Sequence, residues 1–226
     1  MNERVDERNG EASTVRVWDP LVRVFHWSLV VAFVVAYLSS EEGEALHLVA
    51  GYAVLALVAV RLVWGFVGTR HARFSDFVYP PRAVLAYLRG VASGDPPHYR
   101  GHNPAGGWMV LALLLGLIAI SVSGVMLDAA EKGGLIAGGG PGMSLVSQAR
   151  ADEAYAEEYE EEDEEDEEAY AQGEREGGEE AWEEIHEASV NVTLVLIVLH
   201  IAGVLVSGRL HGENLVRAMI TGRKPR

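Results

Sequence analysis

Four histidines lie inside apolar stretches of the chain, where ionisable side chains are rare and usually functional. His186 and His200 lie in the same stretch, fourteen residues apart. In a helix this spacing places both imidazoles on nearly the same face, about 21 Å apart along the axis. His26 and His47 lie in two earlier stretches. Because imidazole is a common axial ligand of haem iron, these residues have the composition that two bis-histidine haems require.

The depth of each histidine in its stretch predicts two pairs. By helical rise, His26 lies about 9 Å from the start of its stretch and His200 about 12 Å from the end of its own. His47 and His186 lie near the opposite membrane surface, within about three residues of their helix ends. We therefore predict two iron sites near opposite membrane surfaces. His26 and His200 form the one called inner, on the side where the first span begins, and His47 and His186 form the one called outer. The alternative for each residue alone is a histidine hydrogen-bonded between helices.

Two arginines are candidates to bind the propionates of the inner haem. Arg61 lies about six residues from the inner end of its stretch, at the level of His26 by helical rise. A guanidinium forms strong charge-assisted hydrogen bonds with a carboxylate. The alternative is that Arg61 extends to the membrane surface. Arg23 is the second propionate candidate.

Three glycines in the spans are candidates to border a haem. Gly51 follows His47 by one helical turn, Gly203 follows His200 by nearly one turn, and Gly124 lies in the third stretch. A missing side chain would admit a flat macrocycle close to the backbone. The alternative is ordinary close packing between helices.

The other histidines lie in basic segments outside the apolar stretches. We expect His71, His98 and His211 to be ordinary interfacial residues. His102 differs because it directly precedes the third apolar stretch, on the side of the inner pair. An inner haem and a quinone headgroup would meet there, so His102 is predicted as a quinone-site residue.

Four apolar segments hold these residues, each close to the roughly 20 residues that a membrane helix needs. We predict an all-α, integral membrane four-helix bundle. Asp19-Pro20 and Asn103-Pro104 carry the N-cap and first-turn signals of helix starts. Residues 82–90 predict a short interfacial helix. The predicted spans are residues 20–39, 45–67, 104–127 and 184–208.

The distribution of basic residues predicts the orientation in the membrane. Arginine and lysine concentrate in the N-terminal tail 1–19, the connection 68–103 and the C-terminal tail 209–226. We expect these three segments, and therefore both termini, to be cytoplasmic. The insertion 128–183, Gly-rich and then acidic, is expected to lie outside and to be disordered.

The net charge of −15 comes from one acidic segment. Residues 151–187 hold 20 of the 33 acidic residues and one of the 18 basic residues, so the rest of the chain is mildly basic. A block of like charge with little apolar content favours disorder or a marginal helix. It is either a solvated loop or a docking surface for a basic redox partner.

Composition excludes several kinds of site. The chain has no cysteine, which rules out disulfides, thiolate ligands and covalent haem attachment through CxxCH. No carboxylate lies in the apolar centre of any span, which argues against a proton pump. Two histidines on each iron would leave no open position for oxygen or substrate.

Five segments together resemble the bacterial membrane-bound di-haem b-type cytochromes. That family includes the b-type cytochrome subunit of nickel–iron hydrogenases and, more distantly, the gamma subunit of formate dehydrogenase. The resemblance covers most of the chain, and the acidic insertion 151–184 is the main departure from it. The segments are VWDPLVRVFHWSLV (17–30), LHLVAGYAVLALVAVRLVWGFVG (46–68), GHNPAGG (101–107), HEASVNVTLVLIVLH (186–200) and HGENLVRAMITGRK (211–224).

The resemblance implies cofactors, ligands and a location. It implies two b haems on His26, His47, His186 and His200, and electron exchange with a membrane quinone near the inner haem. Asn103 and Gly106 look similar to the quinone-side loop of the formate dehydrogenase gamma subunit. A multi-pass protein of the bacterial inner membrane, acting in a respiratory chain, is implied as well.

We therefore expect electron transfer between membrane quinone and a periplasmic c-type cytochrome or redox subunit, and no role with nucleic acid. One alternative is a membrane anchor subunit of a hydrogenase- or dehydrogenase-type complex. Another is a cofactor-free transporter that handles protons or a metal. The sequence leaves open whether the chain is itself a quinone-linked oxidoreductase.

Overall fold

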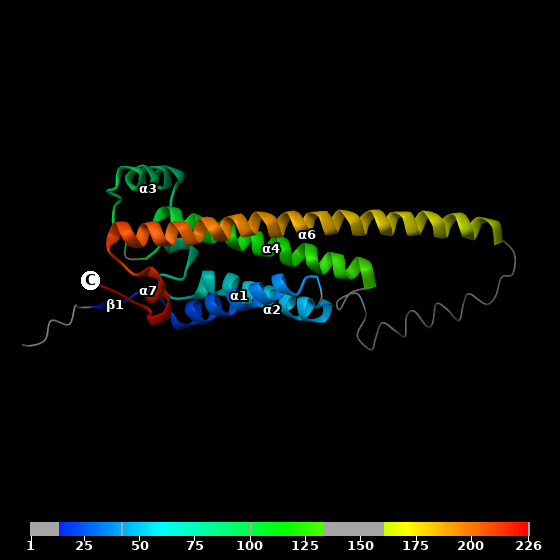
Figure 1. The fold of residues 1–226 in the computed structure, drawn as a ribbon, viewed down its shortest axis with the longest axis horizontal. Coiled ribbons are helices and arrows are strands. Elements are labelled where there is room, and N and C mark those ends of the chain that lie inside the picture. Colours follow the sequence, from blue (N-terminus) through cyan, green and yellow to red (C-terminus); the bar gives the residue numbers. More distant parts are fainter. Residues whose placement is uncertain (1–13, 42, 100, 133–160, 226) are drawn as a thin grey trace, which may run out of the picture. The chain divides into compact units, whose positions relative to one another are not determined.

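The computed structural model of the chain describes residues 14–41, 43–99, 101–132 and 161–225. Four helices in it, α1, α2, α4 and α6, are long and apolar enough to cross a membrane (Figure 1). The predicted all-α membrane fold with four spans is thereby confirmed. The elements in chain order are β1 (Thr14–Arg16), α1 (Pro20–Leu38), α2 (Glu44–Val67), η1 (Phe74–Asp76), α3 (Pro81–Ser93), α4 (Pro104–Lys132), α6 (Glu161–His211), α7 (Leu215–Thr221) and β2 (Arg223–Pro225).

The chain divides into two compact units. The first holds the chain up to Leu113 together with Leu196–Arg226. It contains α1, α2, α3, α7, both strands, the first turns of α4 and the last turns of α6. The second unit, Leu114–Val195, contains the rest of α4 and the preceding part of α6.

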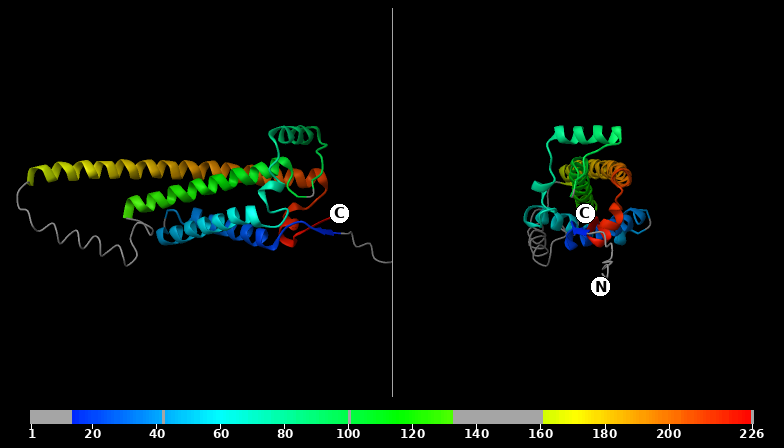
Figure 2. Two further views of the ribbon diagram at one scale, coloured as in Figure 1. Left: turned by 180° about the vertical axis from the view of Figure 1, so that it is seen from behind. Right: turned by 90° about the vertical axis from the view of Figure 1, so that its left-hand side faces the viewer.

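In the first unit, α1 and α2 pack side by side (Figures 1 and 2). The side chain of Asp19 caps α1 as predicted, because its Oδ1 accepts a hydrogen bond from the amide of Leu21 at 2.7 Å. The hydroxyl of Ser39 ends the helix by donating to the carbonyl of Val35 at 2.8 Å. The short connection after Ser39 makes the two helices neighbours.

A two-stranded ribbon joins the segments that flank the first and last spans. Strand β1 pairs antiparallel with β2, with Val15 opposite Lys224. Directly after β1, Trp18 packs with Val17 against Ala218 of α7 in a small apolar cluster. The ribbon was not predicted from the sequence. It holds the chain before α1 and the chain after α6 together within one unit.

A largely buried ion pair closes the same region. Lys224 Nζ lies 3.0 Å from Glu213 Oε2, and the two side chains are only 7% and 9% exposed. His98 Nε2 donates to Glu213 Oε1 at 2.8 Å. Burial acts to raise the pKa of Glu213, but the hydrogen bonds from His98 and Lys224 outweigh it and hold that pKa below its ordinary value. The pair therefore links β2 to the turn between α6 and α7.

Helix α3 contains the predicted interfacial helix. Its Tyr87 is buried, and the phenol oxygen lies 3.4 Å from Ser207 Oγ in the last turns of α6. Leu85 and Leu88 are exposed on another face of the same helix. The helix is confirmed, whereas its position at a membrane surface stays a prediction.

In the second unit, α4 and α6 approach closely. A Cβ atom at Gly116 would lie 2.5 Å from Thr193 Oγ1, so only glycine leaves room for this threonine, which is fully buried. Helix α6 begins at Glu161, in the acidic segment for which the sequence left disorder or a marginal helix open. The preceding part of the predicted insertion, residues 133–160, lies outside the described residues.

Candidate functional site

The predicted inner pair meets within the first unit. His26 on α1 and His200 on α6 lie close enough to interact electrostatically, although most of the chain separates them in sequence. His26 Nδ1 is buried, and no described residue forms a hydrogen bond with it. Buried polar atoms nearly always have a partner, so this nitrogen is exceptional, and no bond from the described residues supports the alternative of a histidine hydrogen-bonded between helices.

Arg61 is buried in the same unit without an acidic partner among the described residues. Its side chain is 3% exposed, and Nη1 has no hydrogen-bond partner there. Its Cζ lies 5.2 Å from the ring centroid of Phe74 and 6.0 Å from that of Phe77. Aromatic rings stabilise a cation, but they replace only part of its lost hydration. The environment of Arg61 therefore fits an anionic group such as a propionate.

Arg23, the other propionate candidate, already has a partner in the chain. Its Nη1 donates to the carbonyl of Thr221 at 3.0 Å. The close approach depends on Gly222, where a Cβ atom would lie 2.6 Å from Nη1. Only Nε of Arg23 is buried without a hydrogen bond from the described chain. Arg61 is consequently the stronger candidate.

The glycines beside the histidines divide into two kinds. A Cβ atom on Gly51 or Gly203 would meet no described atom of a neighbouring element within 4 Å. These two glycines border open space rather than a neighbouring helix, so close helix packing does not account for them. At Gly124 a Cβ atom would lie 3.1 Å from His186 Cε1, so an imidazole already occupies that space.

The predicted outer pair is divided between the two units, and its pairing stays a prediction. Each of the two histidines has an Nδ1 hydrogen bond within its own unit. His47 Nδ1 lies 2.9 Å from the carbonyl oxygen of Ala36, and His186 Nδ1 lies 3.1 Å from Ser123 Oγ. Since a carbonyl only accepts, the hydrogen of this bond lies on His47 Nδ1. A hydrogen bond from the second ring nitrogen is common for histidines that bind a metal through Nε2.

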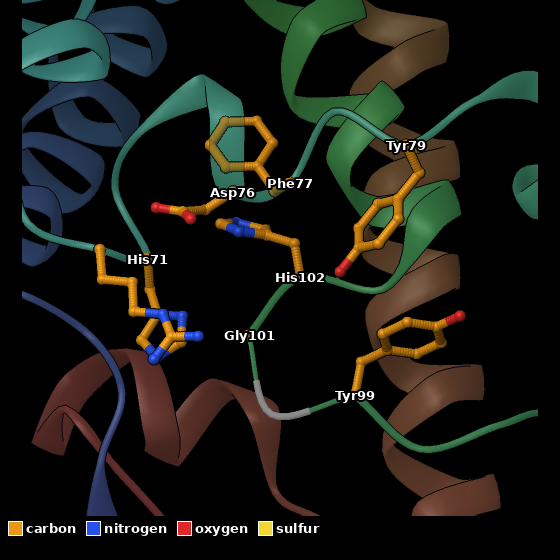
Figure 3. A pocket seen from close by; sticks show the side chains of 8 residues that line it. His71, Asp76, Phe77, Tyr79, Tyr99, Gly101 and His102 are labelled. Carbon is orange, nitrogen blue, oxygen red and sulfur yellow. The ribbon is translucent and has the colours of Figure 1, made fainter.

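His102 lies in the wall of a polar cavity of about 270 Å³ in the first unit (Figure 3). Its ring centroid is 4.7 Å from those of both Trp18 and Phe77, and no described residue bonds to its buried Nδ1. Burial lowers the pKa of His102 to about 3, and the nearby cations Arg61 and Lys224 add to the effect. The imidazole is therefore neutral at pH 7.

Other residues of this cavity were not predicted from the sequence. His71, expected to be an ordinary interfacial residue, packs against Gly101, where a Cβ atom would lie 3.0 Å from its Nδ1. The pKa of Tyr79 is raised by burial first, and then by Tyr99 and Asp76. These residues meet because the connection between α2 and α3 lies against the segment before α4 (Figure 3). No local sequence pattern predicts such a contact.

Asn103 and Gly106 form the N-terminal cap of α4. Asn103 Oδ1 accepts from the amide of Gly106 at 2.7 Å, and the Asn103 carbonyl accepts from Gly107 at 2.9 Å. A Cβ atom at Gly106 would lie 3.1 Å from Oδ1, so glycine suits this turn. The predicted helix start is confirmed, while a role of these residues in quinone binding stays a prediction.

Comparison with known protein families gives a clear match. The family model of prokaryotic cytochrome b561 matches residues 17–222. The chain belongs to this family. It is therefore a membrane cytochrome of electron transfer, and its family implies haem b. The family membership predicted from the sequence is confirmed.

Curated relatives of the cytochrome share the description "probable Ni/Fe-hydrogenase B-type cytochrome subunit". The protein from Bradyrhizobium diazoefficiens is 31% identical over 127 residues, covering 43% of this chain and 51% of the relative. The protein from Azotobacter vinelandii is 30% identical over 157 residues, covering 56% of this chain and 65% of the relative. The matches thus span about half to two thirds of the relatives' length. No solved structure matches the chain significantly.

Proposed function

We propose that this cytochrome carries electrons through two b haems, between a quinone at the cytoplasmic side of the membrane and a redox partner at the outer side. The observation that supports this most strongly is the inner site. Two histidines from distant spans lie together there, and a buried arginine in the same unit has no counter-charge from the described chain.

At the inner site, His26 and His200 would bind the haem iron and Arg61 would bind a propionate. When bound, the haem supplies a metal centre that accepts and releases one electron at a time. His26 and His200 would hold the iron, and Arg61 would neutralise the negatively charged propionate edge of the haem. The apolar helices would exclude water from the site. Open space beside Gly203, near His200, supports a flat group at this place.

At the outer site, His47 and His186 would bind the second haem. The hydrogen bond from His47 Nδ1 to Ala36 supports this role, because it leaves Nε2 as the ligand nitrogen. Open space beside Gly51 supports it as well. Two haems at two depths would carry electrons across the apolar part of the membrane, between the quinone on one side and the redox partner on the other.

We place the quinone beside His102. Its imidazole is neutral at pH 7 and can exchange a hydrogen bond with a quinone oxygen. The polar cavity next to it gives water a way to the ring, and quinone chemistry takes up or releases protons. Asn103 and Gly106 lie at the adjoining helix start and would border the same headgroup.

The partner at the outer side would be a periplasmic c-type cytochrome or a redox subunit. A second candidate function is that of a membrane subunit in a hydrogenase-type complex, and the relatives' descriptions favour it. The cofactor-free transporter has no support left, because the chain belongs to a cytochrome family.

Rapid mixing of the oxidised, haem-loaded protein with soluble menaquinol and ubiquinol analogues tests the quinone role. We expect at least one quinol class to reduce haem in the parent, and His102→Leu to slow that reduction about tenfold, since a lost hydrogen bond costs about 1 kcal/mol or more. His98→Leu, in the same connection but outside the cavity, is the control. Failure of both quinols to reduce haem would contradict the quinone role, and an unchanged rate in His102→Leu would contradict its site.

A further inference from the structure

Ser123 on α4 is almost fully buried, at 1% exposure, and lies against the predicted outer ligand His186. Three atoms surround its hydroxyl oxygen: the carbonyl oxygen of Ala119 at 2.7 Å, that of Ile120 at 3.1 Å, and His186 Nδ1 at 3.1 Å. A serine hydroxyl has one hydrogen to donate and two lone pairs to accept with.

The direction of these bonds follows from their chemistry. The carbonyl of Ala119 is the closest of the three atoms, and a carbonyl only accepts, so the hydroxyl hydrogen of Ser123 points to it. Ser123 Oγ then meets His186 with a lone pair, and His186 Nδ1 donates the hydrogen. His186 Nδ1 thus carries the hydrogen of this bond, as His47 Nδ1 does toward Ala36.

Gly124 constrains the same ring from the next position on α4. A Cβ atom there would lie 3.1 Å from His186 Cε1 and 3.4 Å from Nδ1. An alanine would therefore displace the imidazole by a few tenths of an ångström. Ser123 sets which nitrogen carries the hydrogen, and Gly124 gives the ring its place.

We infer that Ser123 and Gly124 are positioning residues for His186, which they hold in the tautomer and orientation that present Nε2 to the outer haem iron. The inference rests on the proposed function, because it assumes a haem on His186. Partners of a metal-bound histidine's second nitrogen fix the ring and raise its basicity as a ligand. A more basic ligand favours the ferric over the ferrous state.

Ser123→Ala removes the acceptor and should favour the ferrous state of one haem. We expect the ferrous-to-ferric ratio of that haem to rise about tenfold at a given ambient potential, which corresponds to about 59 mV for one electron. Ser123→Thr keeps a hydroxyl and should restore the parent's value. Gly124→Ala should alter the electron paramagnetic resonance of the same ferric haem, which reports ligand orientation.

The chain offers a matched control two residues away. Ser121 lies on the same helix, is 7% exposed, and its hydroxyl has no hydrogen-bond partner within the described residues. Ser121→Ala removes a buried hydroxyl without touching His186. The experiment is a redox titration of each variant in the full chain, followed by visible absorption and by electron paramagnetic resonance.

Each outcome decides the inference. A shift of one haem in Ser123→Ala, or loss of that haem alone, supports it when Ser123→Thr and Ser121→Ala behave like the parent. An unchanged titration in Ser123→Ala overturns it, as does an equal effect of Ser121→Ala or a failure of Ser123→Thr to restore the parent's value. A parent that holds no b haem overturns the proposed function itself, whereas a two-haem parent with an unaffected Ser123→Ala overturns only this inference.

Discussion

Arg61 shows how a single buried charge separates two interpretations of a membrane helix. From the sequence, the guanidinium either extends to the membrane surface or meets a haem propionate. In the structure it is 3% exposed and lies over Phe74 and Phe77, so its charge is held among aromatic rings rather than in water. A cation held in this way needs an anion, and no described residue supplies one.

Replacing that charge should change the redox balance of the inner haem. Arg61→Gln removes a positive charge that would stabilise the more negative ferrous site. A hydrogen bond to a charged group contributes about 1.5–3 kcal/mol, so we expect at least a tenfold fall in the ferrous-to-ferric ratio of one haem at a given potential. A redox titration measures it, with Arg73→Gln, an exposed arginine near Asp76, as control. Equal titrations for Arg61→Gln and the parent would exclude Arg61 as a propionate partner.

The candidate site was predictable from sequence only where the residue type itself was unusual. Histidine and arginine within apolar spans are costly, so His26, His200 and Arg61 stand out by their residue type alone. Ser123 and His71 do not stand out, because serine is common in membrane helices and histidine is common in connections. Their roles depend on the register between α4 and α6 and on a folded connection, neither of which leaves a local pattern.

At the scale of elements, helices were predicted and the ribbon was not. Asp19 and Asn103 cap α1 and α4 as expected, because an N-cap side chain bonds to a nearby amide in the first turn. The strands β1 and β2 have three residues each and pair across nearly the whole chain. A segment that short shows no alternating pattern, and its partner cannot be found from local sequence.

The stability of the ribbon should depend on pH through Glu213. Its pKa is lowered, so its stabilising contribution is fully present above the ordinary value of 4.5 and is lost as pH falls from there toward the lower folded value. We expect Glu213→Gln to reduce hydrogen-exchange protection of the Val17 amide, which donates to Gly222, about tenfold at pH 7. Protection factors measured between pH 3 and 7 check this.

The pH dependence distinguishes the ion pair from a general loss of packing. In the parent, protection at Val17 should fall below about pH 4.5, whereas in Glu213→Gln it should be low and nearly constant over that window. Glu41→Gln, which alters an exposed glutamate in the turn between α1 and α2, should behave like the parent. An acid-induced loss in Glu213→Gln as large as that of the parent would contradict the role of Glu213.

At the scale of the whole molecule, charge distribution and the ribbon point to one topology. Basic residues concentrate before the first span, between the second and third, and after the fourth. Strand pairing between β1 and β2 requires the chain before α1 and after α6 to lie on the same side. An even number of spans, here four, returns the chain to the side on which it began. The basic residues favour the cytoplasm for the side that holds both strands.

Reporter fusions test this orientation directly. A fusion at residue 92, in α3, should show a cytoplasmic reporter, and so should a fusion at residue 226. A fusion at residue 165, in the acidic part of α6, should show an external reporter. Connections with few basic residues are the ones translocated to the outer side of the membrane. A cytoplasmic reporter at residue 165 would overturn the orientation and exchange the inner and outer sites.

The central claim is that two histidine pairs bind two separate b haems, and the haem content of purified ligand variants tests it most directly. The pyridine haemochrome assay should give two non-covalent b haems per chain for the parent. It should give one for each of His26→Ala, His200→Ala, His47→Ala and His186→Ala. Reduced-minus-oxidised spectra should show that the first two variants lose one component and the last two lose the other. A parent without haem, or loss of the same component in His26→Ala and His47→Ala, would contradict the account.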